Sequence, residues 1–363
     1  MTDTMYPTAV EFGSLDEIHE TALGVLPGDV ADFLEGGAGG ETTLLRNRQA
    51  FSRWAVVPEP MSGVALPDTR TSLLGIPLSA PLLAAPFGGD TLFHPDGHRA
   101  VMRAAEEFGV VDIAPEAGSF SYADLRAAAP SAARIAQLHP FAGAVDVAAR
   151  IADIGYDALC VTVDCPVGGF RTRNMRNRFS PDLTPFCGNT PVASDDAPRV
   201  AEVMGQLMSG GGSAWTWDDL SRAARRFRLP WIAKGVLTPA TALRAMDAGA
   251  TGVVVSNHGG RQVDPAPSSL AALPAVRAAV GSGVPVLVDS GFRSGADVFV
   301  ALALGADAVV LGRSVVYGVA AGGEAGVTRV LDLVTEELRV LMTLAGAADV
   351  QAVTSDRVVE IGR

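Results

Sequence analysis

The apolar run Gly252-Val253-Val254-Val255 is followed at once by Ser256-Asn257-His258-Gly259-Gly260-Arg261-Gln262. A short run without polar residues is typical of a strand buried on both faces, as strands of parallel sheets are. The polar residues and paired glycines after it predict a loop at the carboxyl end of that strand. This stretch therefore predicts an α/β fold in which loops after the strands carry the chemistry.

Seven other short apolar runs recur along the chain, and segments with helical periodicity separate them. Eight strand–helix units favour a closed (β/α)8 TIM barrel over an open sheet, and we expect a single domain that spans residues 1–363. Helices are expected at 97–108, 144–154, 239–248, 269–280 and 294–304. Strands are expected at 81–86, 110–114, 134–138, 158–163, 231–234, 252–256, 284–289 and 308–311.

Two segments stand outside this alternation. Residues 1–77 are expected to form an N-terminal helical extension, in which Ser14 caps the first helix and Glu17 follows three residues later. An insertion at about 173–217 separates the fourth and fifth strands and is rich in Pro, Gly, Asp and Ser. Because loops after strands lie at the catalytic face of a barrel, the insertion predicts an active-site lid, with a solvated surface loop as the alternative.

The composition limits the classes of function. The chain has 363 residues, of which 48% are hydrophobic and 19% charged, and its formal net charge is −12. This acidic balance without a basic stripe argues against nucleic acid as the main partner. No apolar run predicts a membrane span and no leader peptide is evident, so we expect a cytoplasmic protein. Cys160, Cys165 and Cys187 form neither a disulfide framework nor a metal pattern, and no metal is expected.

Polar residues gather where the expected strands end. Because these ends meet at one face of a barrel, their joint placement predicts a single site, although each residue alone could be a cap or a surface charge. His258 can exchange a proton near neutral pH and Arg261 offers a planar fork for an anion, whereas the alternative is a satisfied histidine in a plain turn. The glycine-rich turns 290–295 and 311–314 carry arginines and predict a phosphate site.

These motifs resemble one known family. The most specific is Ser-Asn-His-Gly-Gly-Arg-Gln at 256–262, supported by Asn47–Phe51, Thr162-Val163-Asp164, Arg176–Phe179, Lys234-Gly235-Val236 and residues 302–313. From about Leu15 to Ala352 the chain resembles the FMN-dependent 2-hydroxy-acid oxidases and dehydrogenases. That family includes glycolate oxidase, lactate oxidase, mandelate dehydrogenase and hydroxymandelate oxidase.

The resemblance implies oxidation of a small carboxylate substrate, a 2-hydroxy acid, to the 2-oxo acid, with hydride transfer to flavin N5. His258 resembles the catalytic base, Asp164 the carboxylate that stabilises its imidazolium form, and Lys234 the cation near flavin N1. Arg171 and Arg261 resemble the clamp on the substrate carboxylate. The sequence does not separate hydride transfer from earlier loss of the α-proton, nor an oxidase that uses O2 from a dehydrogenase that uses another acceptor.

The resemblance also implies FMN contacts and an assembly. A homo-tetramer or homo-octamer is expected. The remaining FMN contacts are expected from Pro86, Phe87, Gly88, Gln137, Thr162, Ser256, Asp289, Gly291, Arg293, Gly312 and Arg313.

The chain departs from the family where the substrate would lie. Phe33 and His139 fall at the positions of two active-site tyrosines, and we expect both to contact the substrate. The segment 85–90 after the first strand carries Phe87 and two glycines, and Glu116 lies where hydroxyl-bearing residues are usual. Its carboxylate is expected to point to solvent, or alternatively to face a substrate that carries a cation. These changes predict weak activity on glycolate and lactate and a bulkier substrate, aryl and mandelate-like or biosynthetic.

Three other readings stay open from sequence. Glu116 and His139 motivate an FMN-dependent tailoring enzyme that acts on an amine or catalyses oxidative decarboxylation. A non-catalytic flavin-binding scaffold is disfavoured by the joint presence of His258, Asp164 and Lys234 with the two arginines. A barrel like that of IMP dehydrogenase would carry a catalytic cysteine after the sixth strand, and residues 256–262 contain none.

Overall fold

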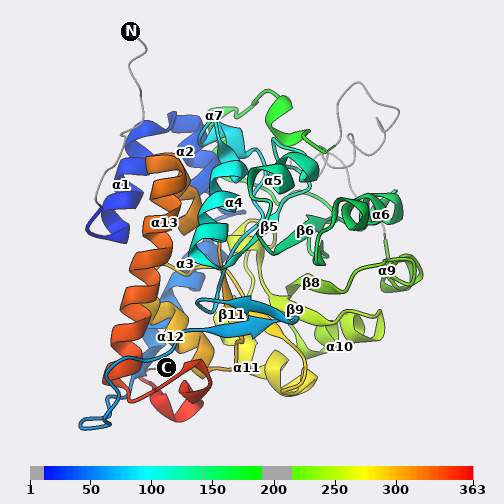
Figure 1. Ribbon diagram of the computed structural model, residues 1–363. Helices are drawn as coiled ribbons and strands as arrows, with labels where there is room; N and C mark the ends of the chain where they lie inside the picture. Colours follow the sequence, from blue (N-terminus) through cyan, green and yellow to red (C-terminus); the bar gives the residue numbers. More distant parts are fainter. Residues whose placement is uncertain (1–11, 142, 190–214, 363) are drawn as a thin grey trace.

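A closed barrel of eight parallel strands forms the centre of the protein (Figure 1). The computed structural model describes residues 12–141, 143–189 and 215–362. Strand β11 pairs with β4 and so closes the barrel, and each predicted strand is confirmed within a few residues. The strands are β4 (Leu82–Ala84), β5 (Val111–Ala114), β6 (Arg134–Leu138), β7 (Ala158–Thr162), β8 (Trp231–Val236), β9 (Gly252–Val255), β10 (Val286–Val288) and β11 (Ala308–Leu311).

Helices follow the barrel strands along the chain and surround the barrel. Their apolar sides pack on the outside of the sheet. The five helices predicted from periodicity are confirmed. They are α4 (Gly97–Phe108), α6 (Ala144–Ile154), α10 (Pro239–Asp247), α11 (Ser269–Val280) and α12 (Gly295–Ala303). The structure adds α5 (Tyr122–Ala128), α9 (Trp217–Ala224) and the long α13 (Arg313–Leu344), which is kinked at Gly322 and Gly323.

The segment before the barrel contains three helices and also strands that the sequence did not predict. The Ser14 hydroxyl accepts the Glu17 N–H as a helix cap, while the Glu17 carboxylate binds the Gly13 N–H. In Figure 1 the first helix lies beside α13, which it contacts. The helices are α1 (Leu15–Val25), α2 (Gly28–Glu35) and α3 (Thr42–Gln49), and the strands are β1 (Trp54–Val56), β2 (Thr71–Leu73) and β3 (Ile76–Leu78).

The strands outside the barrel form two small antiparallel sheets. β1 pairs antiparallel with β12 (Val358–Glu360) near the C-terminus. β2 and β3 form a hairpin that leads directly into β4. Leu73, Ile76 and Leu78 of this hairpin join one hydrophobic cluster with residues that point into the barrel, among them Ile113, Ile135, Ile232 and Leu287. The barrel interior is thus a packed core that the hairpin covers at the amino ends of the strands.

Part of the predicted lid insertion is described. It begins in α7 (Thr172–Asn177) and continues through the short 3-10 helix η3 (Thr184–Phe186), whereas residues 190–214 lie outside the described residues. The Asn189 amide donates to the carbonyls of Pro115 and Glu116, so this end of the segment lies against the loop after β5. The role of the insertion as a lid stays a prediction. The other 3-10 helices are η1 (Phe51–Arg53), η2 (Asp90–Leu92), η4 (His258–Gly260), η5 (Val350–Ala352) and η6 (Ser355–Arg357).

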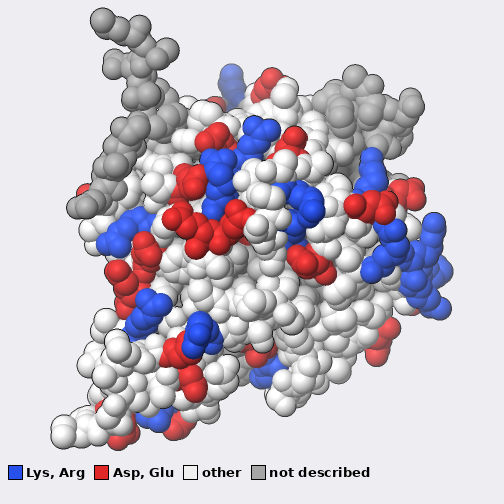
Figure 2. All heavy atoms as spheres, viewed as in Figure 1, with Lys and Arg blue, Asp and Glu red and all other residues white. Residues whose placement is uncertain are grey.

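The visible surface carries interspersed charges of both signs. On the face shown in Figure 2, most acidic and basic side chains lie in mixed clusters, with uncharged surface between them. Ion pairs of the protein include Arg103 with Glu324 and Arg173 with Glu41. Within the described ranges, no helix is both long and apolar enough to cross a bilayer.

Candidate active site

The residues at the carboxyl ends of the strands surround one open cavity with an empty volume of about 950 Å³. Of the residues that the sequence singled out, thirteen line it: Phe33, Pro86, Phe87, Gly88, Arg171, Lys234, His258, Arg261, Asp289, Gly291, Arg293, Gly312 and Arg313. Gln137, His139, Thr162, Asp164 and Ser256 are not among the lining residues.

His258 sits in a tight turn directly after β9. Its backbone has a φ of 58°, a left-handed conformation that is rare for a residue with a side chain. Three contacts hold the turn: the Ser256 hydroxyl accepts the His258 N–H, the Asn257 side chain accepts the Gly260 N–H, and the Ser290 hydroxyl accepts the Gly259 N–H. The polar residues of the motif therefore fix the direction in which the imidazole points.

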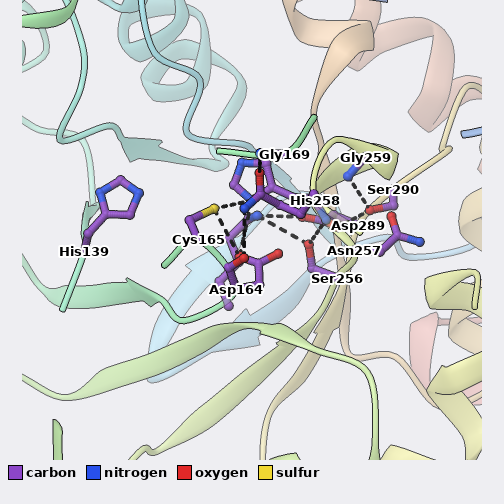
Figure 3. Close-up of polar contacts among 12 residues, drawn as sticks. His139, Asp164, Cys165, Gly169, Ser256, Asn257, His258, Gly259, Asp289 and Ser290 are labelled. Atoms are coloured by element: carbon purple, nitrogen blue, oxygen red, sulfur yellow. Dashed lines mark hydrogen bonds and ion pairs between the residues drawn. The ribbon is translucent and has the colours of Figure 1, made fainter. Parts of the chain in front are cut away.

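Asp164, after β7, faces the histidine. Its Oδ1 lies 3.3 Å from His258 Nδ1, as Figure 3 shows. Burial lowers the pKa of His258, and Lys234 lowers it further, against the opposing effect of Asp164. Burial raises the pKa of Asp164, but the nearby His258 and Lys234 outweigh it, and that pKa is lowered overall. The pair thus combines a neutral, proton-accepting imidazole with an ionised carboxylate that orients it.

Lys234 is a buried cation at the end of β8. Its Nζ lies 3.3 Å from the Ser256 hydroxyl and 3.3 Å from Asp289 Oδ2. Burial alone disfavours the charged amine, but Asp289 and Asp164 outweigh it and raise the pKa of Lys234 above its usual value. The cavity therefore has a fixed positive charge in its wall.

Three arginines line the cavity beside α2. Arg261 and Arg313 donate to backbone carbonyls at the end of α2, including those of Leu34 and Gly36. These contacts suit the negative end of a helix and bind the N-terminal segment to the site. Arg171 differs, because its Nε and Nη1 are buried and have no hydrogen-bond partner among the described residues. Burial lowers the pKa of all three guanidinium groups, and that of Arg313 falls to about 10.

The described part of the site also contains groups that the sequence analysis did not use. The rings of Phe93 and Phe179 stack on Phe33, and Phe186 meets it edge-on. Ser290 holds the histidine turn, and Cys165 contacts both His258 and Asp164. The position of Cys165 in the site could have been predicted, because it directly follows Asp164 in the sequence. The aromatic group comes from three separate segments of the chain, so no local sequence pattern predicts it.

His139 forms a separate pair. Its backbone N–H and its Nδ1 lie 2.7 and 2.9 Å from Glu116 Oε2. In Figure 3 its ring stands apart from the cluster around His258. Gln137 accepts the Glu116 N–H, so its side chain is also engaged with this pair. Thr162 lies beside Lys234 in the sheet register and is buried. The predicted substrate contact of His139 and the FMN contacts of Gln137 and Thr162 stay predictions.

Comparison with known proteins identifies the family. The family model described as FMN-dependent dehydrogenase matches residues 22–360. The chain belongs to this FMN-dependent family. It is 36% identical to the peroxisomal (S)-2-hydroxyacid oxidase GLO3 of Arabidopsis thaliana, over 95% of this chain and 96% of that one. It is 37% identical to the 4-hydroxymandelate oxidase of Amycolatopsis orientalis, over 93% and 96%. A crystal structure of mandelate oxidase superposes with a TM-score of 0.86 at 37% identity, over 96% and 98%.

The cavity of this family member fits FMN. At one end, Gly291 has a φ of 99° and Gly312 precedes the first turn of α13, with Arg293 and Arg313 beside them. A side chain built at Gly312 would meet nothing closer than 4.0 Å, so space for a ligand remains there. Backbone N–H groups at a helix start together with arginines suit a phosphate. At the other end, the cationic Lys234 suits the flavin ring, which gains negative charge on reduction.

Proposed function

We propose that the enzyme oxidises a 2-hydroxy acid to the corresponding 2-oxo acid, with His258 as the base and O2 as the final acceptor. The observation that carries this proposal is the buried Arg171, whose Nε and Nη1 have no partner in the described structure and which lines the same cavity as His258. A buried guanidinium without a partner is costly, and a substrate carboxylate would satisfy it. Arg261, which lines the same cavity, would supply the second half of the clamp.

The proton of the substrate would go to His258. Because Nδ1 faces Asp164, the other ring nitrogen, Nε2, is left to take the proton. Asp164 would then stabilise the imidazolium that forms, as a buried carboxylate does for a catalytic histidine. Bound FMN supplies the two-electron acceptor for the oxidation. Its phosphate would be held by Arg293, Gly291 and the start of α13, and its ring by Lys234 and the segment Pro86–Gly88.

The substrate would be bulky or aryl. Phe33, Phe87 and Phe93 line the cavity, and the ring of Phe33 lies 4.9 Å from the Arg261 guanidinium and 5.9 Å from that of Arg171. An aromatic wall next to the carboxylate clamp suits a phenyl group on the hydroxyl-bearing carbon. Mandelate and 4-hydroxymandelate oxidases are among the proteins similar to this chain, and lactate oxidases are equally similar, so the choice rests on the aromatic wall. An amine substrate has less support, because Glu116 binds His139 and does not line the cavity.

A comparison of an acid with its amide tests the clamp. Wild-type holoenzyme should turn over a 2-hydroxy acid far faster than the neutral primary amide of the same acid. Arg171→Met should lower kcat/KM for the acid at least roughly 30-fold, since breaking a buried charge pair costs about 2–5 kcal/mol. It should leave turnover of the amide nearly unchanged. The matched control is Arg173→Met, which removes an arginine that pairs with Glu41 instead. Equal turnover of acid and amide by the wild-type enzyme would refute the proposal.

A further inference from the structure

Three different metal-ligand types meet beside the cavity. His258 Nδ1 lies 3.3 Å from Asp164 Oδ1 and 3.3 Å from Cys165 Sγ, and Sγ lies 3.6 Å from Oδ1. The three residues come from two loops, after β7 and after β9, and Figure 3 shows their polar atoms converging. Catalysis as proposed above uses the histidine and the carboxylate. It assigns no task to the thiol.

The spacing of the three atoms matches one face of a zinc tetrahedron. With bonds of about 2.0–2.3 Å to nitrogen, oxygen and sulfur, neighbouring ligand atoms of a tetrahedral zinc ion lie roughly 3.3–3.6 Å apart. Nδ1 has hydrogen-bond geometry toward both Oδ1 and Sγ, so the in-plane bonding direction of this nitrogen points between them. Asp164 Oδ2 is buried without a hydrogen-bond partner in the described structure, which leaves the carboxylate free to turn toward a cation.

We propose that Asp164, Cys165 and His258 bind a soft divalent cation such as Zn²⁺, and that its binding inhibits the enzyme. On binding, the thiol proton leaves to solvent and the proton on His258 Nδ1 is exchanged through solvent for one on Nε2. The thiolate, the freed Nδ1 and the carboxylate then each donate an electron pair to the cation. Nothing is oxidised, and water or a substrate oxygen takes the fourth position. The binding site stands on the geometry of the three residues alone, whereas the inhibition rests on the proposed role of His258.

The charges around the cluster set the expected strength and selectivity. Lys234 and Arg171 act electrostatically on this cluster and oppose a dication, although Lys234 is itself paired with Asp289. The affinity should therefore be micromolar, well below that of a structural zinc site. A thiolate and an imidazole favour Zn²⁺ or Cd²⁺ over Mg²⁺, which prefers oxygen ligands. A metal on Nδ1 would make the imidazole a poor base and separate it from Asp164.

Calorimetric titration of the FMN holoenzyme with Zn²⁺ tests the binding. We expect one Zn²⁺ per chain, inhibition over the same concentration range, recovery with a chelator, and neither effect with Mg²⁺. Cys165→Ala should bind Zn²⁺ about tenfold or more weakly, because it loses one ligand of three. Cys165→Ser repeats the test if the alanine variant does not fold. Cys187→Ala, which removes a thiol from η3, should bind Zn²⁺ as the wild type does.

The results separate this inference from the proposed function. Failure of the wild type to bind Zn²⁺, or equal binding by the wild type and Cys165→Ala, would overturn the metal site. Calorimetry measures Zn²⁺ binding directly, so the binding can be tested even if no 2-hydroxy acid is a substrate. Failure of every hydroxy acid with Zn²⁺ binding intact would refute the proposed function and leave the metal site standing.

Discussion

At the scale of single residues, the left-handed backbone conformation of His258 is the feature that most strongly indicates a functional site. A φ of 58° costs free energy for a residue with a side chain, and such strain gathers at functional sites. Here Ser256, Asn257 and Ser290 offset that cost with hydrogen bonds to the turn. The turn is thus built to present one imidazole at the cavity wall.

Replacing that imidazole tests its role as the base. His258→Gln should slow reduction of bound FMN by a 2-hydroxy acid by about 100- to 10,000-fold, the usual contribution of a positioned general base. The FMN content should stay near that of the wild type, because the glutamine leaves Lys234 and the phosphate end unchanged. Stopped-flow absorbance without oxygen measures the rate. His94→Gln, which alters a histidine outside the cavity, is the control, and a loss of less than tenfold in His258→Gln would exclude a base role.

The residues of the site could be predicted only in part, and the reason is physical. Barrel topology brings the carboxyl ends of the strands together, so residues such as Lys234 and His258 could be placed in one site from sequence. Which atoms they contact depends on side-chain directions set by distant elements. The bonds of Arg261 and Arg313 to the carbonyls of α2, and the pair of Glu116 with His139, therefore appear only in the structure.

At the scale of elements, the barrel strands could be predicted from the sequence, whereas the hairpin of β2 and β3 could not. Each barrel strand is almost entirely buried, so its sequence is mostly apolar and recognisable as a short hydrophobic run. The hairpin strands β2 and β3 have only three residues each, with exposed positions between buried ones, and β3 contains a proline. β1 pairs with β12 from the opposite end of the chain, and no local pattern signals such a pairing.

The hairpin should contribute strongly to stability. Ile76 is buried in the cluster that fills the barrel. Ile76→Ala should lower the free energy of unfolding by about 2–5 kcal/mol, because it removes packed methyl groups and leaves a cavity. Urea unfolding followed by circular dichroism gives the value. Ser72→Ala, at an exposed position of the same hairpin, should change it by less than about 0.5 kcal/mol. Similar values for both variants would show that the hairpin does not cover the core.

The start of α13 and the turn after β10 should hold the phosphate of FMN. Arg293→Ala should weaken FMN binding roughly tenfold or more, since hydrogen bonds to charged groups contribute about 1.5–3 kcal/mol. Riboflavin, which lacks the phosphate, should bind the variant and the wild type alike. Fluorescence titration of the apoprotein measures both affinities. An equal loss for riboflavin and FMN would place Arg293 away from the phosphate.

At the scale of the whole molecule, the aromatic group at the cavity joins three separate parts of the chain. Phe33 comes from α2, Phe93 from the loop after β4, and Phe179 and Phe186 from the insertion after β7. We therefore predict a higher kcat/KM for mandelate than for glycolate, by at least roughly tenfold, because a buried phenyl group adds well over 1.4 kcal/mol of binding. Oxygen-consumption assays give the ratio. Equal or faster turnover of glycolate would contradict an aromatic substrate pocket.

The most direct measurement is a visible spectrum of the purified holoenzyme without oxygen, before and after addition of 2-hydroxy acids. Oxidised FMN is yellow, and its absorbance should disappear when mandelate or a related aryl hydroxy acid is added, then return when air is admitted. The 2-oxo acid should accumulate in equal amount to the FMN reduced. A yellow protein that no 2-hydroxy acid bleaches, while an amine or another compound does, would contradict hydroxy-acid oxidation at this site.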